Sequence, residues 1–231
     1  FHCKNSDGNT ATVLKYKNHR IIKGKNYLSA LPSARGGECS TLIVCLEDNL
    51  HKIEVDLAYT IYDNYGVLVR SANIKNNGNN KLELNNIYSS SIDLPASEYE
   101  ILHLHGSWSR ELSEESMIVP SGRFVIESNR GSSSAAHFPF IAVCEEQCNE
   151  IHGNIYSSSL IYSGNHSISV EKGEFNDVRL LTGINSFNFN WSLNPGDNFQ
   201  TPEAVHVYSK NGLRGMSNIW HSFIRDKITP K

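Results

Sequence analysis

The stretch from residue 178 to residue 208 places the tightest constraint on the fold of this chain. Every second residue from 187 to 193 is aromatic or leucine, with asparagine or serine between, which is the period-two pattern of a half-buried strand. Asn-Pro-Gly-Asp follows at 194–197, where proline presets φ and glycine accepts the positive φ of a type II turn. A second apolar run then includes Ala204, Val205 and Val207. The stretch therefore predicts an aromatic strand, a tight turn and a return strand, with Trp191 in the core.

Short strand patterns recur along much of the rest of the chain. The clearest runs from Ile53 to Ile61, where apolar residues alternate with polar ones, so we expect one face in the core and the other in water. Turn signals at 64–66 and 76–80 bound the neighbouring runs. No long helical pattern lies between these runs, which argues against alternating β and α units. The pattern predicts an all-β fold, a large two-layer antiparallel sandwich.

Only the C-terminal tail has a helical pattern. Between residues 212 and 228, apolar residues recur every three or four positions, which places them on one stripe of a helix. Ser209 or Asn211 is the candidate N-cap, and Pro230 disfavours helix in the residue before it. Trp220 lies on the stripe, so we expect it to pack against the sandwich or against a further domain. No linker or repeat is evident, and we interpret residues 1–231 as one domain.

Composition argues against several kinds of partner. Charged residues make up 19% of the chain, the formal net charge is −3, and there is no basic run, so neither nucleic acid nor an anionic membrane is expected. No apolar stretch approaches the length that spans a bilayer. Five cysteines are an odd number for a disulfide framework, which favours reduced thiols and a cytoplasmic location. No signal peptide is evident. The chain begins at Phe1 and not at an initiator methionine, which suggests a cut fragment.

Several motifs together resemble the N-terminal domain of the family 36 glycoside hydrolases, the α-galactosidases. Residues 183–205 match the family's G-I-N-x-F-x-F-x-W-x-L-x-P-G-x-x-F-x-T-P-E-A-V. Further segments resemble S-x-S-x-D-L-P at 89–95, L-x-G-x-W-x-R-E at 104–111, I-E-S-x-R-G at 126–131 and G-x-x-Y-x-x-S-L-V-Y-S-G-N at 153–165. Residues 133–140 depart from the family's S-S-H-Q-H-N-P-F, because one histidine and the asparagine are missing. We also expect the family's first strands to be missing from the start of the chain.

The resemblance implies a galactose mutarotase-like β-supersandwich that precedes a (β/α)8 barrel. In this family the barrel carries two catalytic aspartates, which hydrolyse terminal α-galactosides of the melibiose and raffinose type with retention. No such barrel lies in this sequence, so the resemblance implies a non-catalytic domain, with no catalytic residue and no cofactor. Such a domain is expected to support the barrel, shape one wall of the galactose pocket and help to build a tetramer, with residues 212–228 leading towards the barrel. A stand-alone carbohydrate-binding module is the alternative.

Two groups of residues have the spacing of metal ligands. His103 and His105 place two imidazoles on one strand face, but nothing nearby in the sequence supplies a third ligand. Cys144, Cys148 and His152 form the second group, which lacks a fourth ligand at a recognisable spacing. Ordinary polar histidines and an unpaired surface loop are the preferred interpretations, so no metal site is predicted.

Trp108 and Arg110 are the candidate substrate-binding or interface pair. They lie in a Gly-Ser-Trp-Ser-Arg loop, whose polar neighbours suit an exposed tryptophan that stacks on a sugar ring. Packing between subunits is the equal alternative. Three carboxylates also lie in family-like segments, and a capping or turn role is predicted for each of them: Asp93, Glu127 and Glu203.

Overall fold

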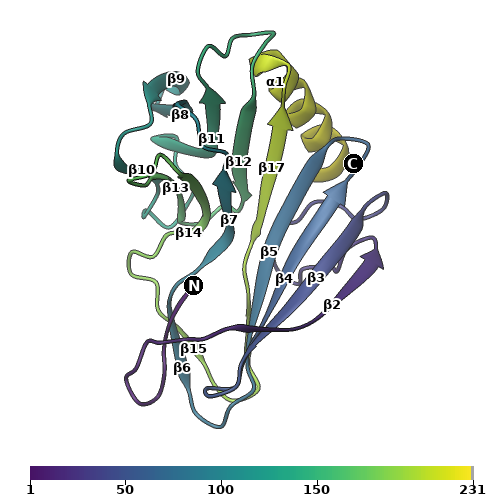
Figure 1. The fold of residues 1–231 in the computed structure, drawn as a ribbon, viewed down its shortest axis with the longest axis vertical. Helices are drawn as coiled ribbons and strands as arrows, with labels where there is room; N and C mark the ends of the chain where they lie inside the picture. Colours follow the sequence, from purple (N-terminus) through teal and green to yellow (C-terminus); the bar gives the residue numbers. More distant parts are fainter. Residues whose placement is uncertain (230–231) are drawn as a thin grey trace.

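The computed structural model describes residues 1–229, which form three β-sheets and a C-terminal helix (Figure 1). The elements, in chain order, are β1 (His2–Lys4), β2 (Lys15–Lys23), β3 (Ser40–Asp48), β4 (Ile53–Tyr62), β5 (Val67–Asn76), β6 (Leu82–Asn86), β7 (Tyr88–Leu94), β8 (Tyr99–Ser107), β9 (Arg110–Ile118), β10 (Gly122–Glu127), β11 (His137–Glu145), β12 (Ile155–Ile161), β13 (His166–Lys172), β14 (Val178–Ile184), β15 (Trp191–Leu193), β16 (Asn198–Gln200), β17 (Glu203–Ser209), α1 (Gly212–Phe223) and the π-helical turn η1 (Ile224–Ile228). The all-β prediction is confirmed.

The largest sheet has ten strands in the order β2-β3-β4-β5-β17-β12-β11-β8-β9, with β16 pairing with β5. The smaller sheets have the orders β10-β13-β14-β7 and β1-β6-β15. All of these strand pairs are antiparallel, as predicted. The last strand, β17, lies in the middle of the large sheet, where it pairs with β5 on one side and β12 on the other.

Both small sheets pack against the same face of the large sheet, through two separate hydrophobic cores. The four-stranded sheet contributes Ile126, Ile168 and Leu180 to a core that it shares with β8 and β11. The three-stranded sheet contributes Leu84 and Leu193 to a core that it shares with β4 and β5. Two sheets that each bury one face in this way form a sandwich, so the predicted two-layer β-supersandwich is confirmed.

The helix α1 covers the opposite face of the large sheet beside β17 and β12 (Figure 1). Trp220 is buried there, donates from Nε1 to Ser157 Oγ at 2.8 Å, and meets Phe140 edge-on at 5.7 Å between ring centroids. Asn211 is the N-cap residue, but its side chain makes no capping hydrogen bond. The helical prediction for 212–228 is confirmed as α1 followed by η1, and Pro230 lies outside the described residues. In residues 1–229 neither helical segment is long and apolar enough to cross a membrane.

The prediction for the aromatic stretch 187–193 is wrong in two respects. The strand begins only at Trp191, whose side chain is 50% exposed, and Phe187 before it is 58% exposed. The predicted turn at 194–197 is present, with Gly196 at φ +87° and Asp197 N donating to Asn194 O at 3.0 Å. However, β15 and β16 do not pair with each other, because β15 pairs with β6 and β16 with β5. The turn therefore passes the chain between two sheets, which leaves the ring of Trp191 at the surface.

Strand β4 shows why its alternating pattern only partly predicts burial. Ile53 and Val55 are buried against the three-stranded sheet, whereas Ile61 at the far end of the same face is 49% exposed. Thr60 and Tyr62 on the other face are buried instead, because α1 and the segment before β3 cover that end. Each face of the large sheet is thus covered over a different part of its length.

Candidate functional site

Trp108 and Arg110 lie at the tip of the hairpin that joins β8 to β9. Trp108 is 91% exposed, and Ser109 between them has φ +68°. A Cβ at Gly106 would meet Arg110 O at 2.1 Å, so glycine is required where the hairpin narrows. The pair is therefore displayed on a tight turn, but the structure does not bring it together with the polar groove described next.

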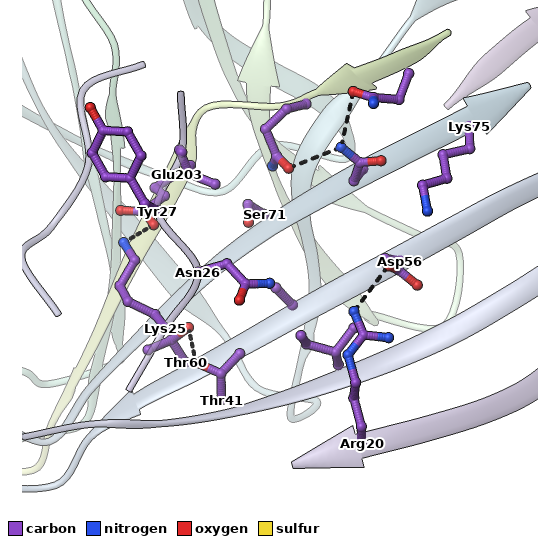
Figure 2. Close-up of a pocket in the computed structure, with 16 residues that line it drawn as sticks. Arg20, Lys25, Asn26, Tyr27, Thr41, Asp56, Thr60, Ser71, Lys75 and Glu203 are labelled. Carbon is purple, nitrogen blue, oxygen red and sulfur yellow. Dashed lines mark hydrogen bonds and ion pairs between the residues drawn. The ribbon is translucent and has the colours of Figure 1, made fainter. Parts of the chain in front are cut away.

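A polar groove of about 260 Å³ lies over β3, β4 and β5 on the face of the large sheet that α1 also covers. Figure 2 shows the residues that line it. Its floor is the polar face of β3, β4 and β5, and β16 with the start of β17 forms one side. The segment after β2 adds a wall with Tyr27, whose side chain is 85% exposed. The groove is lined by Arg20, Lys25, Asn26, Tyr27, Leu28, Thr41, Ile43, Asp56, Ala58, Thr60, Ser71, Asn73, Lys75, Asn198, Gln200 and Glu203.

Two hydrogen-bond acceptors on the groove floor have no partner within residues 1–229. Asp56 and Asn73 are neighbours across β4 and β5, and the Oδ1 atom of each is buried without a hydrogen bond. Arg20 holds the other carboxylate oxygen of Asp56 at 3.4 Å, and Asn73 Nδ2 donates to Gln200 Oε1 at 3.2 Å. A buried polar atom without a partner is costly, so this floor is suited to a ligand that brings hydroxyl donors.

A buried ion pair closes one end of the groove. Lys25 Nζ bonds to Glu203 Oε1 and also donates to Ala34 O at 2.9 Å, while Ala34 N donates to Glu203 Oε2 at 2.8 Å. The carboxylate thereby holds the segment between β2 and β3 against β17. Glu203 thus fixes a loop through an ion pair, which the predicted turn or capping role did not include.

The other two carboxylates from family-like segments also have partners of their own. Asp93 on β7 accepts two hydrogen bonds from Arg179 on β14, at 2.6 and 3.3 Å, and this pair lowers the pKa of the carboxyl group. Glu127 accepts a hydrogen bond from Asn185 Nδ2 at 3.3 Å. Neither carboxylate has the predicted turn or capping role. Asp93 makes a cross-strand contact, and Glu127 contacts the loop after β14.

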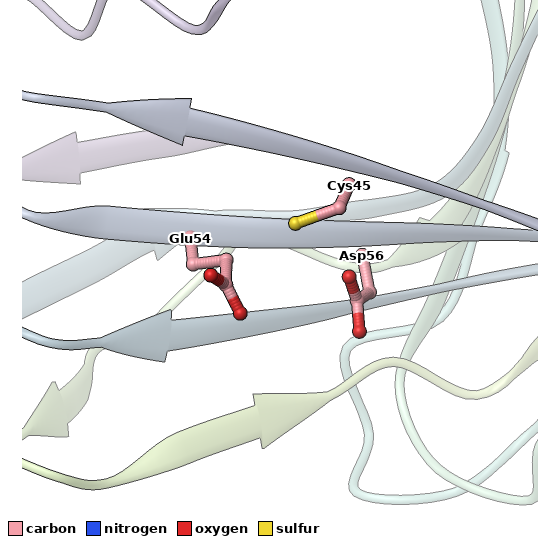
Figure 3. Close-up of side chains that lie close together, drawn as sticks. All are labelled: Cys45, Glu54 and Asp56. Atoms are coloured by element: carbon pink, nitrogen blue, oxygen red, sulfur yellow. The ribbon is translucent and has the colours of Figure 1, made fainter. Parts of the chain in front are cut away.

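Cys45, Glu54 and Asp56 form a compact group on the same sheet face, with one ligand-type atom from each within 4.8 Å of the others (Figure 3). Cations already neutralise its carboxylates: Lys17 Nζ lies 2.8 Å from Glu54, and Arg20 lies 3.4 Å from Asp56. Burial, and then the neighbouring Asp56 carboxylate, raise the pKa of the Cys45 thiol to about 11. A protonated thiol beside paired acids is a poor metal ligand set.

The two groups with metal-like spacing start from neighbouring strands, because β8 pairs with β11, but Cys144 and His103 face opposite sides of the large sheet. Cys148 and His152 lie in the loop after β11, as predicted, whereas Cys144 is buried near the end of that strand and not in a surface loop. All five cysteines are free. His103 and His105 lie on β8, on the face that packs against the four-stranded sheet.

The groove was not predicted, although part of its signal is in the sequence. The alternating polar positions of residues 53–61 mark one face of β4, and Asp56 is among them. Nothing local indicates that Tyr27 and Asn73 would lie on the same groove, because they are joined only by the folding of β2 onto β3 and of β4 onto β5.

Comparison with known proteins gives the family. Residues 1–194 match the sequence profile described as the glycosyl hydrolase family 36 N-terminal domain. The chain is 42% identical over 225 residues to alpha-galactosidase AgaA of Geobacillus stearothermophilus, covering 96% of this chain and 31% of that protein. It is 40% identical over 228 residues to alpha-galactosidase Mel36A of Lactobacillus acidophilus, covering 97% of this chain and 31% of that protein.

Comparison with solved structures gives the same family. The fold matches AgaA from Geobacillus stearothermophilus in complex with stachyose with a TM-score of 0.97 and 40% identity, over 99% of this chain and 32% of that one. It matches the alpha-galactosidase from Lactobacillus brevis with a TM-score of 0.96 and 32% identity, over 99% and 31% of the two chains. The chain thus spans about a third of the length of these relatives. This chain belongs to the N-terminal domain family of the family 36 glycosyl hydrolases.

Proposed function

We propose that this chain is the non-catalytic N-terminal domain of an α-galactosidase that hydrolyses terminal α-galactosides of the melibiose and raffinose type with retention. In this proposal residues 1–231 form one domain, and a catalytic (β/α)8 barrel follows them in the full-length protein. The domain supports the barrel, shapes one wall of the galactose pocket and contributes to the oligomer. No cofactor is required.

One observation carries the proposal. Relatives at 40–42% identity over nearly the whole chain are named α-galactosidases, and the chain accounts for only 31% of their length. The remaining two thirds of such a protein has room for a barrel of about 250 residues. Solved relatives bound stachyose and raffinose, which supports α-galactosides as the substrate class for the full-length protein here.

The end of the helix suggests where that barrel packs. An apolar groove of about 660 Å³ runs between α1 and the sheet, and Ile224 and Ile228 of η1 line it beside Leu102, Phe138 and Leu213. An apolar surface of this kind is usually covered by another part of the protein. We propose that the downstream barrel covers it, because the last element that the structure describes, η1, itself lines this groove.

Activity measurements on two lengths of the protein test the proposal. Purified 231-residue protein and the full-length protein that contains it are assayed with p-nitrophenyl α-galactoside under the same conditions. We expect the full-length protein to turn over this substrate and the 231-residue protein not to do so. Robust turnover by the 231-residue protein would overturn the assignment of catalysis to the missing part.

The hairpin tip is the proposed contact for other subunits or for the galactose pocket. A 91% exposed tryptophan is a large apolar surface for one turn, and tryptophan and arginine are enriched at interface hot spots. We expect a tetramer for the full-length protein. Trp108→Ala and Arg110→Ala are compared with Leu50→Ala, another exposed apolar residue, by light scattering and by KM. An unchanged oligomer together with an unchanged KM in both variants would remove the hairpin from the proposal.

The location is proposed to be cytoplasmic. Five free cysteines, including Cys144 and Cys148 in the same region, suit a compartment that keeps thiols reduced. Fractionation of the producing cells, followed by detection of the full-length protein, tests this directly. Recovery of most of the protein outside the cytoplasm would contradict it.

A second candidate function is sugar binding by the polar groove. The groove offers two unpartnered oxygens, Oδ1 of Asp56 and Oδ1 of Asn73, which are able to accept hydrogen bonds from sugar hydroxyl groups. Tyr27 adds an exposed aromatic ring on the wall. Calorimetry with galactose and raffinose tests this on the 231-residue protein. Heat that is lost in Asn73→Ala but kept in Trp108→Ala would place the sugar in the groove, and the reverse pattern would place it at the hairpin. No heat at millimolar sugar would remove this function.

A further inference from the structure

The hairpin of β8 and β9 brings two histidines and a glutamate to one patch of the sheet. Glu115 on β9 lies directly opposite His103 on β8, and His105 follows two residues later on the same face. His103 Nε2 and His105 Nε2 lie 3.6 and 3.4 Å from the same oxygen, Glu115 Oε2. The third ligand that the sequence alone did not supply is therefore provided by the neighbouring strand.

These distances suit ligands of a shared metal ion better than direct hydrogen bonds. Hydrogen bonds between nitrogen and oxygen are about 2.7–3.2 Å long. Two ligand atoms that each lie about 2.0–2.1 Å from a tetrahedral zinc ion are separated by about 3.3 Å. The His103 and His105 ring centroids are 5.8 Å apart, and two imidazoles bound to one such ion have centroids about 5 Å apart.

One side of this patch is fixed and the other is free to move. His103 is buried, and its ring packs against Phe124 of β10 at 5.2 Å between centroids. The side chains of His105 and Glu115 are both more than one third exposed, so they are able to rotate towards His103. That rotation is needed, because the ligand atoms of His103, His105 and Glu115 do not all lie within 4.8 Å of one another. Within residues 1–229 only the Cys45 group meets that condition.

Charge favours the histidine patch over the Cys45 group. Glu115 has no lysine or arginine partner in the described part of the chain, whereas Lys17, Lys75 and Arg20 occupy Glu54 and Asp56.

A third histidine completes the patch. His137 on β11 pairs with His105 in the sheet, and its ring lies 6.2 Å from that of His103. Within residues 1–229 the Nδ1 atom of His137 is buried without a hydrogen-bond partner, so it is able to accept a bond from water or to bind an ion.

We propose that His103, His105 and Glu115 bind one divalent transition-metal ion, with Zn²⁺ as the fitting probe, and that His137 stands beside them as a fourth candidate ligand. Imidazole nitrogen with one carboxylate oxygen is a ligand set that zinc accepts. The ion joins β8 to β9, an edge strand whose nine residues are all exposed, so the expected role is to fix this edge of the sheet.

Zinc titration of the 231-residue protein, stripped of metal with a chelator, tests the proposal by competition with a chromophoric chelator. We expect one zinc ion per chain and at least tenfold weaker binding in both His105→Ala and Glu115→Ala. His152→Ala, from the competing Cys144, Cys148 and His152 group, is the matched control and should leave binding unchanged. Both test residues are partly exposed, and circular dichroism checks that each variant folds like the parent.

Cobalt substitution gives an independent readout. Visible absorption by bound Co²⁺ without a near-ultraviolet thiolate band supports nitrogen and oxygen ligands. The proposal is overturned by the absence of zinc binding, by binding that His105→Ala and Glu115→Ala leave intact, or by a thiolate band that places the ion at the cysteines.

Discussion

Replacing Phe223 by alanine should remove much of the attachment of the C-terminal helix. Phe223 is fully buried in the last turn of α1, and its ring meets Tyr62 and Tyr65 edge-on at 5.0 and 5.7 Å between centroids. Truncation of a buried phenylalanine costs about 3–5 kcal/mol, because apolar contacts are lost and a cavity remains. Each edge-on aromatic pair contributes about 0.5–1.5 kcal/mol within that total. We therefore expect the free energy of unfolding to fall by about 4 kcal/mol.

Urea denaturation of Phe223→Ala measures this loss. With an m value of about 2–3 kcal/mol/M, the midpoint should fall by about 1–2 M. His221→Ala, an exposed position on the same helix, is the control and should change the free energy by less than about 0.5 kcal/mol. Tryptophan fluorescence and far-ultraviolet circular dichroism are followed together, since an earlier fluorescence transition would reveal local release of the helix. A loss below about 1 kcal/mol with coincident transitions would refute the argument that this ring anchors the helix.

Three further predictions concern buried polar groups. Ser157→Ala removes the only acceptor recorded for a buried indole N–H, so it should lower the free energy of unfolding by about 1–3 kcal/mol, measured by urea denaturation, and Ser157→Thr should restore part of it. Glu203→Gln leaves the Lys25 ammonium buried without its counter-charge and should cost about 3–5 kcal/mol; a double variant with Lys25→Met that is no more stable than the single one would contradict this. Burial, and then the charge of Arg70, lower the pKa of His206 to about 3, below its unfolded value of about 6.5. The unfolded state therefore binds the proton more readily, and stability should fall as pH drops from about 6.5 towards 4, by up to about 3 kcal/mol from this group. A pH–stability slope in this range that is unchanged in His206→Gln would argue against that assignment.

The helix and the class of fold were predictable, because each depends on a pattern that is visible within a single stretch of sequence. The stripe in 212–228 faces a single sheet, so its period of three to four residues has one meaning. The short strands and turns exclude alternating β and α units without any knowledge of their partners.

Burial of individual strand residues was less predictable, because the large sheet is covered on both faces but over different lengths. Ile61 continues the apolar face of Ile53 and Val55, yet the three-stranded sheet does not reach it. Trp191 continues an aromatic pattern, but Phe187 and Phe189 before it lie outside the strands, and its half-exposed ring meets Phe199 edge-on at 5.3 Å between centroids. A period of two identifies two faces and does not say which of them is covered.

The candidate sites depend on strand register, which the sequence did not give. Glu115 joins His103 and His105 only because the hairpin places residue 115 opposite residue 103. Asp56 and Asn73 become neighbours in the same way across β4 and β5. Motifs within one strand were visible in advance, whereas the residue that completes each site lies on another strand.

The central position of β17 has a consequence for synthesis of the protein on the ribosome. Strands β5 and β12 pair with β17, whose residues 203–209 emerge after all the other strands. Until then the nascent chain holds two half-sheets with open inner edges, which are templates for pairing with other chains. A translational pause before residue 203 would prolong that exposure, so the codons just upstream of β17 bear on how much protein reaches the native state rather than an aggregate.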